Sequence, residues 1–316
     1  MGQNTNYERY PLNVFKPEEI TVDRSRYKYY LVRFDNLYEL HDYLKSNPNV
    51  NKEVFHELSS RTGGEKFAGM PYDKAVDDLI NSEDAKYFEF VNLIKEIINV
   101  KHGDTHKYRT VQTLAGGHIN TPLYSAGVPL CYETEERITK PKYITLYSAL
   151  SYSGSTIDEQ IFNRAVILIS IINALEKRGY SIRLNAFEMS SCGDEVVNNV
   201  IGLKQHGSKI NIPALYKTSF KKEFLRRILF GVLETVGVEN AWGGSYGKSC
   251  DEGFVREVLH VKKEDIYFGT PQELGITGGN LEKDFMSVLK KLKLEENVDI
   301  RSMSDDFREN AKRLIK

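Results

Sequence analysis

The feature that most limits how this chain can fold is a long apolar helix predicted between two strands. The first strand is predicted over residues 142–150 and the second over 181–189, and the helix between them over about 157–177. Apolar residues from Ala165 to Ala174 nearly encircle this helix, which predicts that it is covered on every side. The run is too short to cross a bilayer. We therefore interpret it as the central helix of a core.

Other strands and helices alternate with this unit along the chain. Strands are predicted at 29–34, 196–204 and 265–269, and helices at 37–44, 74–80, 84–100, 219–236, 281–292 and 305–315. Strands that alternate with helices of this length favour a parallel sheet with helices on both faces. The fold class predicted is therefore α/β, with a doubly wound, mostly parallel sheet.

The pattern changes near residue 140, which divides the chain into three predicted regions. Residues 1–27 are polar and contain two prolines, which predicts a tail or an extended arm. Residues 28–140 are expected to form a smaller, α-rich N-terminal region that ends in a loop-rich stretch. Residues 141–316 contain the α/β domain and its C-terminal helices.

Composition excludes some classes of function. The 43 basic and 44 acidic residues give a net charge of −1, which argues against a general polyanion binder. Three cysteines, at positions 131, 192 and 250, lack the spacing of metal ligands, so reduced cytosolic thiols are expected. The N-terminus lacks the apolar core of a signal peptide. A cytoplasmic protein without membrane contact is therefore predicted.

The turn after the first strand of the α/β domain carries a family resemblance. Strand, S-x-S turn, apolar helix and strand follow one another as in a von Willebrand A domain, which this region (about 142–293) resembles. That family binds a divalent ion through a D-x-S-x-S motif, and the resemblance aligns its two serines with Ser151 and Ser153. The leading aspartate is replaced by Ala149. Since Mg²⁺ requires anionic oxygen ligands, no metal site and no cofactor are expected.

The whole chain is also similar to uncharacterised proteins of bacteriophages and their hosts. This resemblance implies a phage or prophage-type protein in the cytoplasm of a bacterial host cell, and it implies no activity. We therefore expect a non-enzymatic protein that binds another macromolecule, most simply a protein, through the carboxyl edge of its sheet.

The candidate binding residues lie at the turn that opens the long helix. In open α/β sheets ligands bind beside the carboxyl ends of the strands, and the first N–H groups of a helix attract anionic oxygen. Arg164, inside the helix, is expected to offer a counter-charge if it points toward the turn. The alternative is that the hydroxyls only cap the helix. The candidate residues are Ser151, Tyr152, Ser153, Ser155, Thr156 and Arg164.

Two other functions stay open at this stage. Nucleic-acid binding is favoured by a cluster of cations at one helix start, made of Lys217, Lys221, Lys222, Arg226 and Arg227. A solvated helix face is the simpler interpretation of such a cluster. An enzyme with an unrecognised site is the third reading, although no catalytic residue can be assigned from the sequence.

Overall fold

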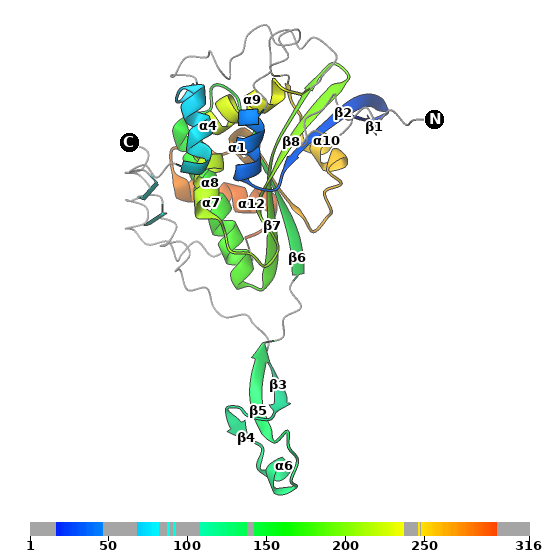
Figure 1. The fold of residues 1–316 in the computed structure, drawn as a ribbon, viewed down its shortest axis with the longest axis vertical. Coiled ribbons are helices and arrows are strands. Elements are labelled where there is room, and N and C mark those ends of the chain that lie inside the picture. Colours follow the sequence, from blue (N-terminus) through cyan, green and yellow to red (C-terminus); the bar gives the residue numbers. More distant parts are fainter. Residues whose placement is uncertain are drawn as a thin grey trace.

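A computed structural model describes residues 17–46, 68–81, 87–88, 91–92, 108–137, 142–236, 246 and 248–295. The predicted helix over 84–100 lies mostly outside these residues, and the predicted helix over 305–315 lies wholly outside them. The fold is mixed α/β, as predicted, and it centres on one seven-stranded sheet with helices packed against it (Figure 1).

The sheet has the strand order β1-β2-β8-β7-β6-β10, and β9 pairs with β7 beside this path. Its strands are β1 (Glu18–Val22), β2 (Ser25–Phe34), β6 (Lys142–Ala149), β7 (Tyr180–Cys192), β8 (Glu195–Lys204), β9 (Lys248–Ser249) and β10 (Ile266–Phe268). Three of the six pairings are parallel, namely β2 with β8, β6 with β7, and β6 with β10. The other three are antiparallel. The sheet is therefore mixed rather than mostly parallel.

The long helix α7 (Asp158–Lys177) is the core helix that the sequence predicts. Every residue from Ile161 to Leu175 is buried, including the polar Asn163 and Ser170. Such burial follows from its apolar circumference, because neighbouring elements cover it on every side. Ser170 donates its hydroxyl to the Val166 carbonyl within the helix, so its polarity adds no unsatisfied group.

Most helices pack on one face of the sheet, where they form the larger core with α7 (Figure 1). They are α1 (Leu37–Ser46), α4 (Tyr72–Asn81), α8 (Ile212–Ser219), the π-helical segment η2 (Phe224–Leu229), α9 (Phe230–Leu233), α11 (Pro271–Leu274) and α12 (Leu281–Leu292). On the other face, α10 (Glu252–Val258) covers a smaller apolar cluster around Phe187. The N-terminal strand β2 joins this sheet across the boundary predicted near residue 140, through its pairing with β8.

The helix predicted over 219–236 corresponds to η2 and α9, and a further helix, α8, comes before it. Asn211 caps α8, where its side chain accepts a hydrogen bond from the Ala214 N–H at 3.1 Å, and Pro213 follows in the first turn. These residues start the helical region earlier than the apolar spacing suggested. After α8 the chain continues through η2 into α9.

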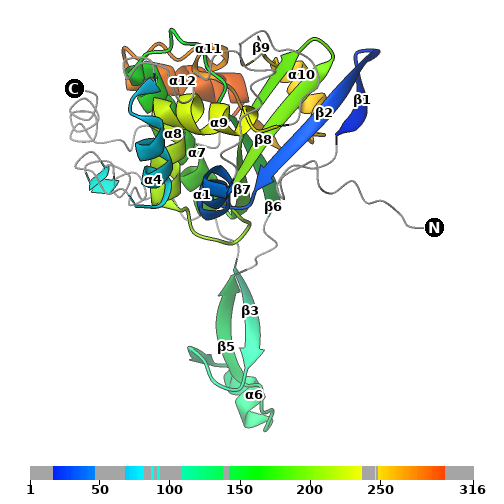
Figure 2. The same ribbon diagram turned by 45° about the horizontal axis from the view of Figure 1, so that its top comes forward.

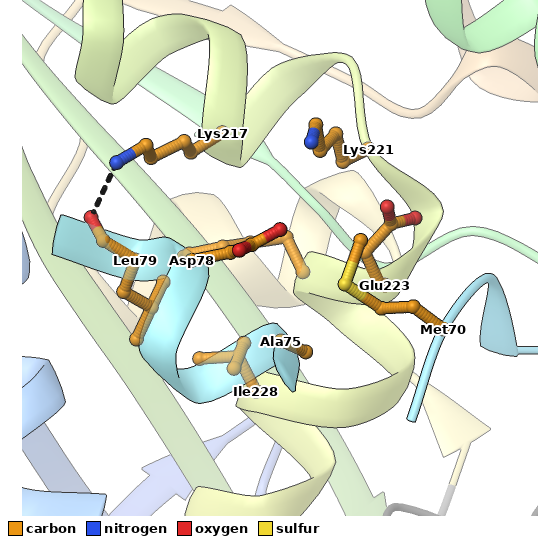
Figure 3. Close-up of a pocket in the computed structure, with 9 residues that line it drawn as sticks. Met70, Ala75, Asp78, Leu79, Lys217, Lys221, Glu223 and Ile228 are labelled. Atoms are coloured by element: carbon orange, nitrogen blue, oxygen red, sulfur yellow. Dashed lines mark hydrogen bonds between the residues drawn. The ribbon is translucent and has the colours of Figure 1, made fainter. Parts of the chain in front are cut away.

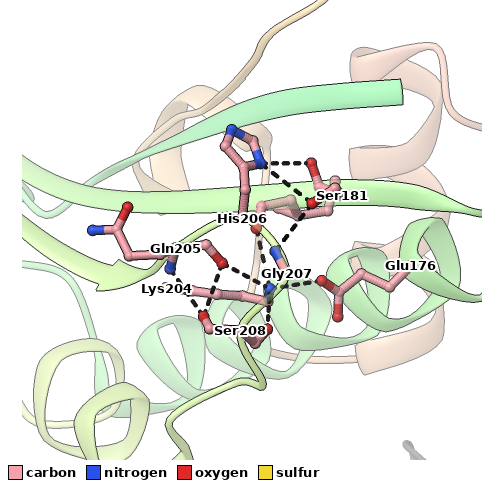
Figure 4. A network of polar contacts seen from close by, with 8 residues as sticks. Glu176, Ser181, Lys204, Gln205, His206, Gly207 and Ser208 are labelled. Atoms are coloured by element: carbon pink, nitrogen blue, oxygen red, sulfur yellow. Dashed lines mark hydrogen bonds and ion pairs between the residues drawn. The ribbon is translucent and has the colours of Figure 1, made fainter. Parts of the chain in front are cut away.

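The buried Lys204 lies near the amino ends of β6 and β7, and several oxygen acceptors surround its ammonium group (Figure 4). Its Nζ lies 2.7 Å from Glu176 Oε1 at the end of α7. The same atom donates to the carbonyl oxygens of Ile182 at 3.1 Å and Ser208 at 2.5 Å. A buried ammonium requires such a shell of oxygens, so Lys204 fastens β8 and its following turn to α7 and β7.

Residues 108–137 form a separate small module where the sequence predicted loops. It consists of β3 (Tyr108–Thr113), β4 (His118–Ile119), α6 (Thr121–Ser125) and β5 (Tyr132–Arg137), with strand order β3-β5-β4. In both ribbon views the module extends away from the rest of the protein (Figure 2).

No helix in the described part of the chain has the length and apolar character needed to span a membrane.

Candidate functional site

The carboxyl end of β6 lies where the sheet connections change direction. From β6 the chain crosses through α7 to β7 on one side, whereas β10 pairs with β6 on the other side. The loops after β6 and β10 therefore leave the sheet in different directions. In open α/β folds this arrangement produces the crevice that binds ligands.

Arg164 from α7 lies beneath the ends of these two strands. Its Nε donates to the Gly269 carbonyl at 2.8 Å, and its Nη2 lies within hydrogen-bond distance of Ala149 O (2.6 Å) and Phe268 O (3.1 Å). Nη2 also lies 3.0 Å from Ser148 Oγ. The guanidinium therefore joins the ends of β6 and β10 from below.

The setting of Arg164 is apolar apart from these acceptors. The side chain is 2% exposed, and its guanidinium lies 4.8 Å from the centre of the Phe268 ring. Burial lowers the pKa of Arg164 to about 10, so the group remains cationic at neutral pH. Its acceptors are neutral main-chain and hydroxyl oxygens rather than carboxylates.

This cation stands at the place where the family resemblance puts a metal ion. Ala149 offers only its carbonyl oxygen there, and Arg164 already binds that oxygen. Divalent ions require anionic oxygen ligands. In the described part of the chain, no group of three or more His, Cys, Asp or Glu side chains is placed to hold a metal. The residues around Arg164 therefore do not fit a magnesium centre.

The hydroxyl residues of the turn divide into buried and exposed members. Ser151 and Thr156 are buried, and Thr156 Oγ1 accepts a hydrogen bond from Gln272 Nε2 at 2.6 Å. Ser153 and Ser155 are exposed, and their hydroxyl oxygens lie 2.7 Å apart. The two exposed hydroxyls therefore bond to each other at the surface of the turn.

None of these hydroxyls caps α7. The N-cap residue is Ile157, and no side chain accepts a hydrogen bond there from the first turn of the helix. Gln160 instead accepts from the Ile157 N–H through its side-chain oxygen at 3.2 Å. The capping alternative for Ser153, Ser155 and Thr156 is therefore wrong. The apolar side chain of Ile157 remains 50% exposed.

Tyr152 points inward rather than toward a partner. Part of its ring is exposed, whereas its hydroxyl is buried. Burial raises the pKa of Tyr152 to about 12, although the nearby Arg164 and Arg226 favour the ionised form. The phenol therefore stays neutral, and it belongs to the support of the turn more than to its surface.

Three of the five residues in the basic cluster predicted for nucleic acid face the interior, whereas Lys221 and Lys222 are partly exposed. Lys217, Arg226 and Arg227 are buried. Lys217 donates to Leu79 O on α4 at 2.9 Å, at one side of a pocket of about 270 Å³ (Figure 3). Arg227 donates to Met70 O at 2.5 Å. These cations fasten neighbouring segments together, so they do not form the exposed face that phosphates would require.

One member of the basic cluster reaches the candidate turn. Arg226 Nη2 donates to Gly154 O at 3.3 Å, so this buried arginine binds the turn from the side of η2. Lys222 forms an ion pair nearby, in which its Nζ lies 3.6 Å from Asp158 Oδ1. The lysine side chain is partly exposed and the aspartate is largely exposed. The two groups of residues that the sequence treated as separate sites therefore meet at one place.

The charge at the start of α7 does not favour an anion. Asp158 and Glu159 occupy its first turn and complement the positive end of the helix dipole. Arg164 is buried on main-chain oxygens below them and does not reach the surface. The expectation that a partner's acidic side chain binds here is therefore not supported by the placement of these charges.

Sequence reasoning missed two contributors to the site. Ile157 was treated as the first residue of the helix, although Gln160 three residues later is typical of the position opposite an N-cap. Gln272 in α11 carries no local sequence signal, because its contact with Thr156 joins segments 116 residues apart in sequence.

Residues 9–296 match the family described as Domain of unknown function (DUF7192). The chain belongs to this family. No curated protein and no solved structure matches it.

Proposed function

We propose that this protein is a non-enzymatic binding protein that contacts a protein partner through the carboxyl edge of its sheet. The contact surface is the turn from Ser153 to Ile157. The observation that carries this proposal is that the buried Arg226 and the side chain of Gln272 bind the turn from two other elements, while Ser153, Ser155 and Ile157 stay exposed. A surface fixed before binding loses little conformational entropy when a partner binds.

Several contacts contribute to this rigidity. The Thr156 N–H donates to Ser153 O at 3.1 Å, which closes the turn on itself. Gln272 in α11 binds the Thr156 hydroxyl, and Arg226 in η2 binds the Gly154 carbonyl. Two elements far apart in sequence therefore bind the same five-residue turn.

The exposed groups define the chemistry of the partner. Ile157 offers an apolar side chain, Ser153 and Ser155 offer hydroxyls, and Asp158 adds an exposed carboxylate beside them. The matching surface is an apolar pocket with hydrogen-bonding and basic groups at its rim. Exposed apolar anchors with a polar surround are typical of protein contact sites.

The resemblance to von Willebrand A domains and to phage or prophage proteins of the bacterial cytoplasm belongs to this proposal. The order β6-α7-β7 and the position of β6 between β7 and β10 support a doubly wound centre. Antiparallel strands at one side of an otherwise parallel arrangement occur in many α/β sheets, so the β7–β8 pair is compatible with it.

The test uses Ile157→Ser, which removes the exposed apolar group and supplies a better N-cap. Serine with Gln160 three residues later makes a capping box, so the variant should be as stable as the wild type or about 1 kcal/mol more stable. The control is Met286→Gln, because Met286 on α12 is also 50% exposed. Tyr152→Ala is unsuitable because it would disturb the buried support of the turn.

Affinity purification from the source cells, with quantitative mass spectrometry, measures which proteins remain bound. We expect a partner that the wild type and Met286→Gln retain and that Ile157→Ser loses, although Ile157→Ser melts no earlier. Equal retention of every partner by Ile157→Ser would overturn the proposal.

A further inference from the structure

The second face of the sheet is only partly covered by α10. Val255 of α10 packs among Phe187, Met189 and Val196, near the carboxyl end of β6. The other described helices of the body contribute their buried residues to the core on the opposite face. Toward the amino end of β6, the second face therefore has no described helix over it.

We call this uncovered part the open sheet face, and it extends across adjacent strands. Residues two apart on a strand share a face, so Arg183 and Asn185 lie on the side of Phe187. Strand pairing places Thr145 beside Arg183 and Tyr147 beside Asn185. The residues that matter below are Arg33, Tyr143, Thr145, Tyr147, Arg183 and Asn185, and each is exposed or partly exposed.

This face carries two tyrosine rings, both on β6, and two guanidinium groups, one on β7 and one on β2. Tyr143 is 62% exposed, and Tyr147 lies four residues further along β6, about 13 Å away at the rise of a strand. The Tyr147 hydroxyl lies within electrostatic reach of both Arg183 and Arg33. Tyr147 therefore stands beside two cations, and the ring of Tyr143, further along the same strand, meets the His206 ring edge-on at 5.1 Å.

The two arginines differ in their contacts. The Arg183 Nε is buried and has no hydrogen-bond partner in the described part of the protein. Arg33 pairs with Asp35 at 3.5 Å, and both side chains are partly exposed, so this ion pair is weak. The nearby Asp265 accepts hydrogen bonds from the Thr145 and Lys262 N–H groups, which occupy its carboxylate.

We propose that the open sheet face binds single-stranded nucleic acid, with bases stacked on Tyr143 and Tyr147 and phosphates against Arg33 and Arg183. Unpaired bases stack on exposed tyrosines of a sheet without regard to sequence, and arginines beside them neutralise the backbone. A duplex is excluded as ligand because its bases are already stacked. This inference does not rest on the proposed function, since the turn at Ile157 lies outside the open sheet face.

The test measures fluorescence anisotropy of labelled 12-nucleotide oligo(rU) and oligo(dT) with the full chain. Two phosphate contacts predict a slope of about −1.4 in log affinity against log salt. Tyr143→Ala should weaken binding roughly five- to a hundredfold, because stacking is lost. Arg183→Gln should reduce the slope to about −0.7. The controls are Tyr38→Ala, since Tyr38 on α1 is 67% exposed, and the exposed Lys283→Gln on α12.

The inference stands if both controls bind as the wild type and both face variants weaken binding as stated. A preference between the two oligonucleotides then identifies RNA or DNA as the ligand. No saturable binding to either strand would overturn it, as would a Tyr143→Ala variant equal to Tyr38→Ala. Equal competition by polyglutamate would also overturn it, because the face would then recognise an acidic polymer by charge alone.

Discussion

Replacing Arg164 by methionine should test whether the buried arginine holds the carboxyl ends of β6 and β10 together. Methionine keeps most of the apolar stem and removes every donor. The carbonyl oxygens of Ala149, Phe268 and Gly269 then lose the guanidinium that binds them. Because β10 has only three residues, it has few other bonds to β6.

The magnitude follows from these lost contacts. Each buried acceptor left without its donor lowers the free energy of unfolding by about 1–3 kcal/mol, although water that reaches these oxygens offsets part of this. Loss of the desolvation penalty of the charge offsets more. We therefore expect the free energy of unfolding to fall by about 3–5 kcal/mol, and by less for Arg164→Lys, which keeps a donor and the charge.

Urea denaturation followed by circular dichroism measures this difference. The matched control is Arg256→Met on α10, where the arginine pairs with Glu252 one helical turn away at 2.7 Å and is partly exposed. That control should lose at most about 1 kcal/mol. If Arg164→Met lowered the free energy of unfolding no more than Arg256→Met, the argument that Arg164 joins the ends of β6 and β10 would be refuted.

Three further predictions concern the interior. Ile169→Ala, at a site 1% exposed in α7, should lower the free energy of unfolding by about 2–5 kcal/mol, and an unchanged melting temperature would contradict its burial. Lys204→Met should cost about 3–5 kcal/mol by leaving Glu176 and the Ile182 and Ser208 carbonyls unpaired, which denaturation measures. Burial raises the pKa of Glu188 from 4.5 to about 7. Its folded form therefore binds the proton more tightly, so this contribution to stability is fully present below about pH 4.5, declines by up to about 3 kcal/mol as the pH rises to about 7, and is lost above that pH. Glu188→Gln should remove this decline, and an equal decline in the variant would exclude Glu188 as its source.

The central unit of the fold was predictable from the sequence. Strict apolar character over one helix, with a strand on each side, defined β6, α7 and β7 within two or three residues at most ends. Burial can be predicted from such a long apolar segment, because a helix that is apolar on all sides is stable only when other elements cover it.

The direction of the strands was less well predicted, although the sequence contains the signal. Only Gly193 and Asp194 separate β7 from β8. Two residues cannot cross a sheet, so strands joined this way must be antiparallel. Gly193 has a φ of 61°, which suits glycine at such a turn. This hairpin is the reason that the sheet is mixed.

The candidate site shows why local patterns reach only so far. The position of the turn after β6 could be predicted from strand, hydroxyl residues and helix. The inward course of Arg164, Arg226 and Lys217 could not, because their acceptors lie on segments at least 15 residues away in sequence, and 138 residues away for Lys217. From the sequence alone, a run of cations therefore predicts a solvated helix face, because the distant acceptors that bury it are not visible there.

Amide hydrogen exchange of the full chain, alone and with the captured partner, tests the central claim most directly. The claim is that a rigid turn from Ser153 to Ile157 is the contact surface. Peptides that cover residues 151–160 should exchange more slowly in the complex than in the free protein, and those that cover α12 should exchange alike in both. Unchanged exchange over 151–160, with slowing confined to another surface such as residues 108–137, would contradict the account.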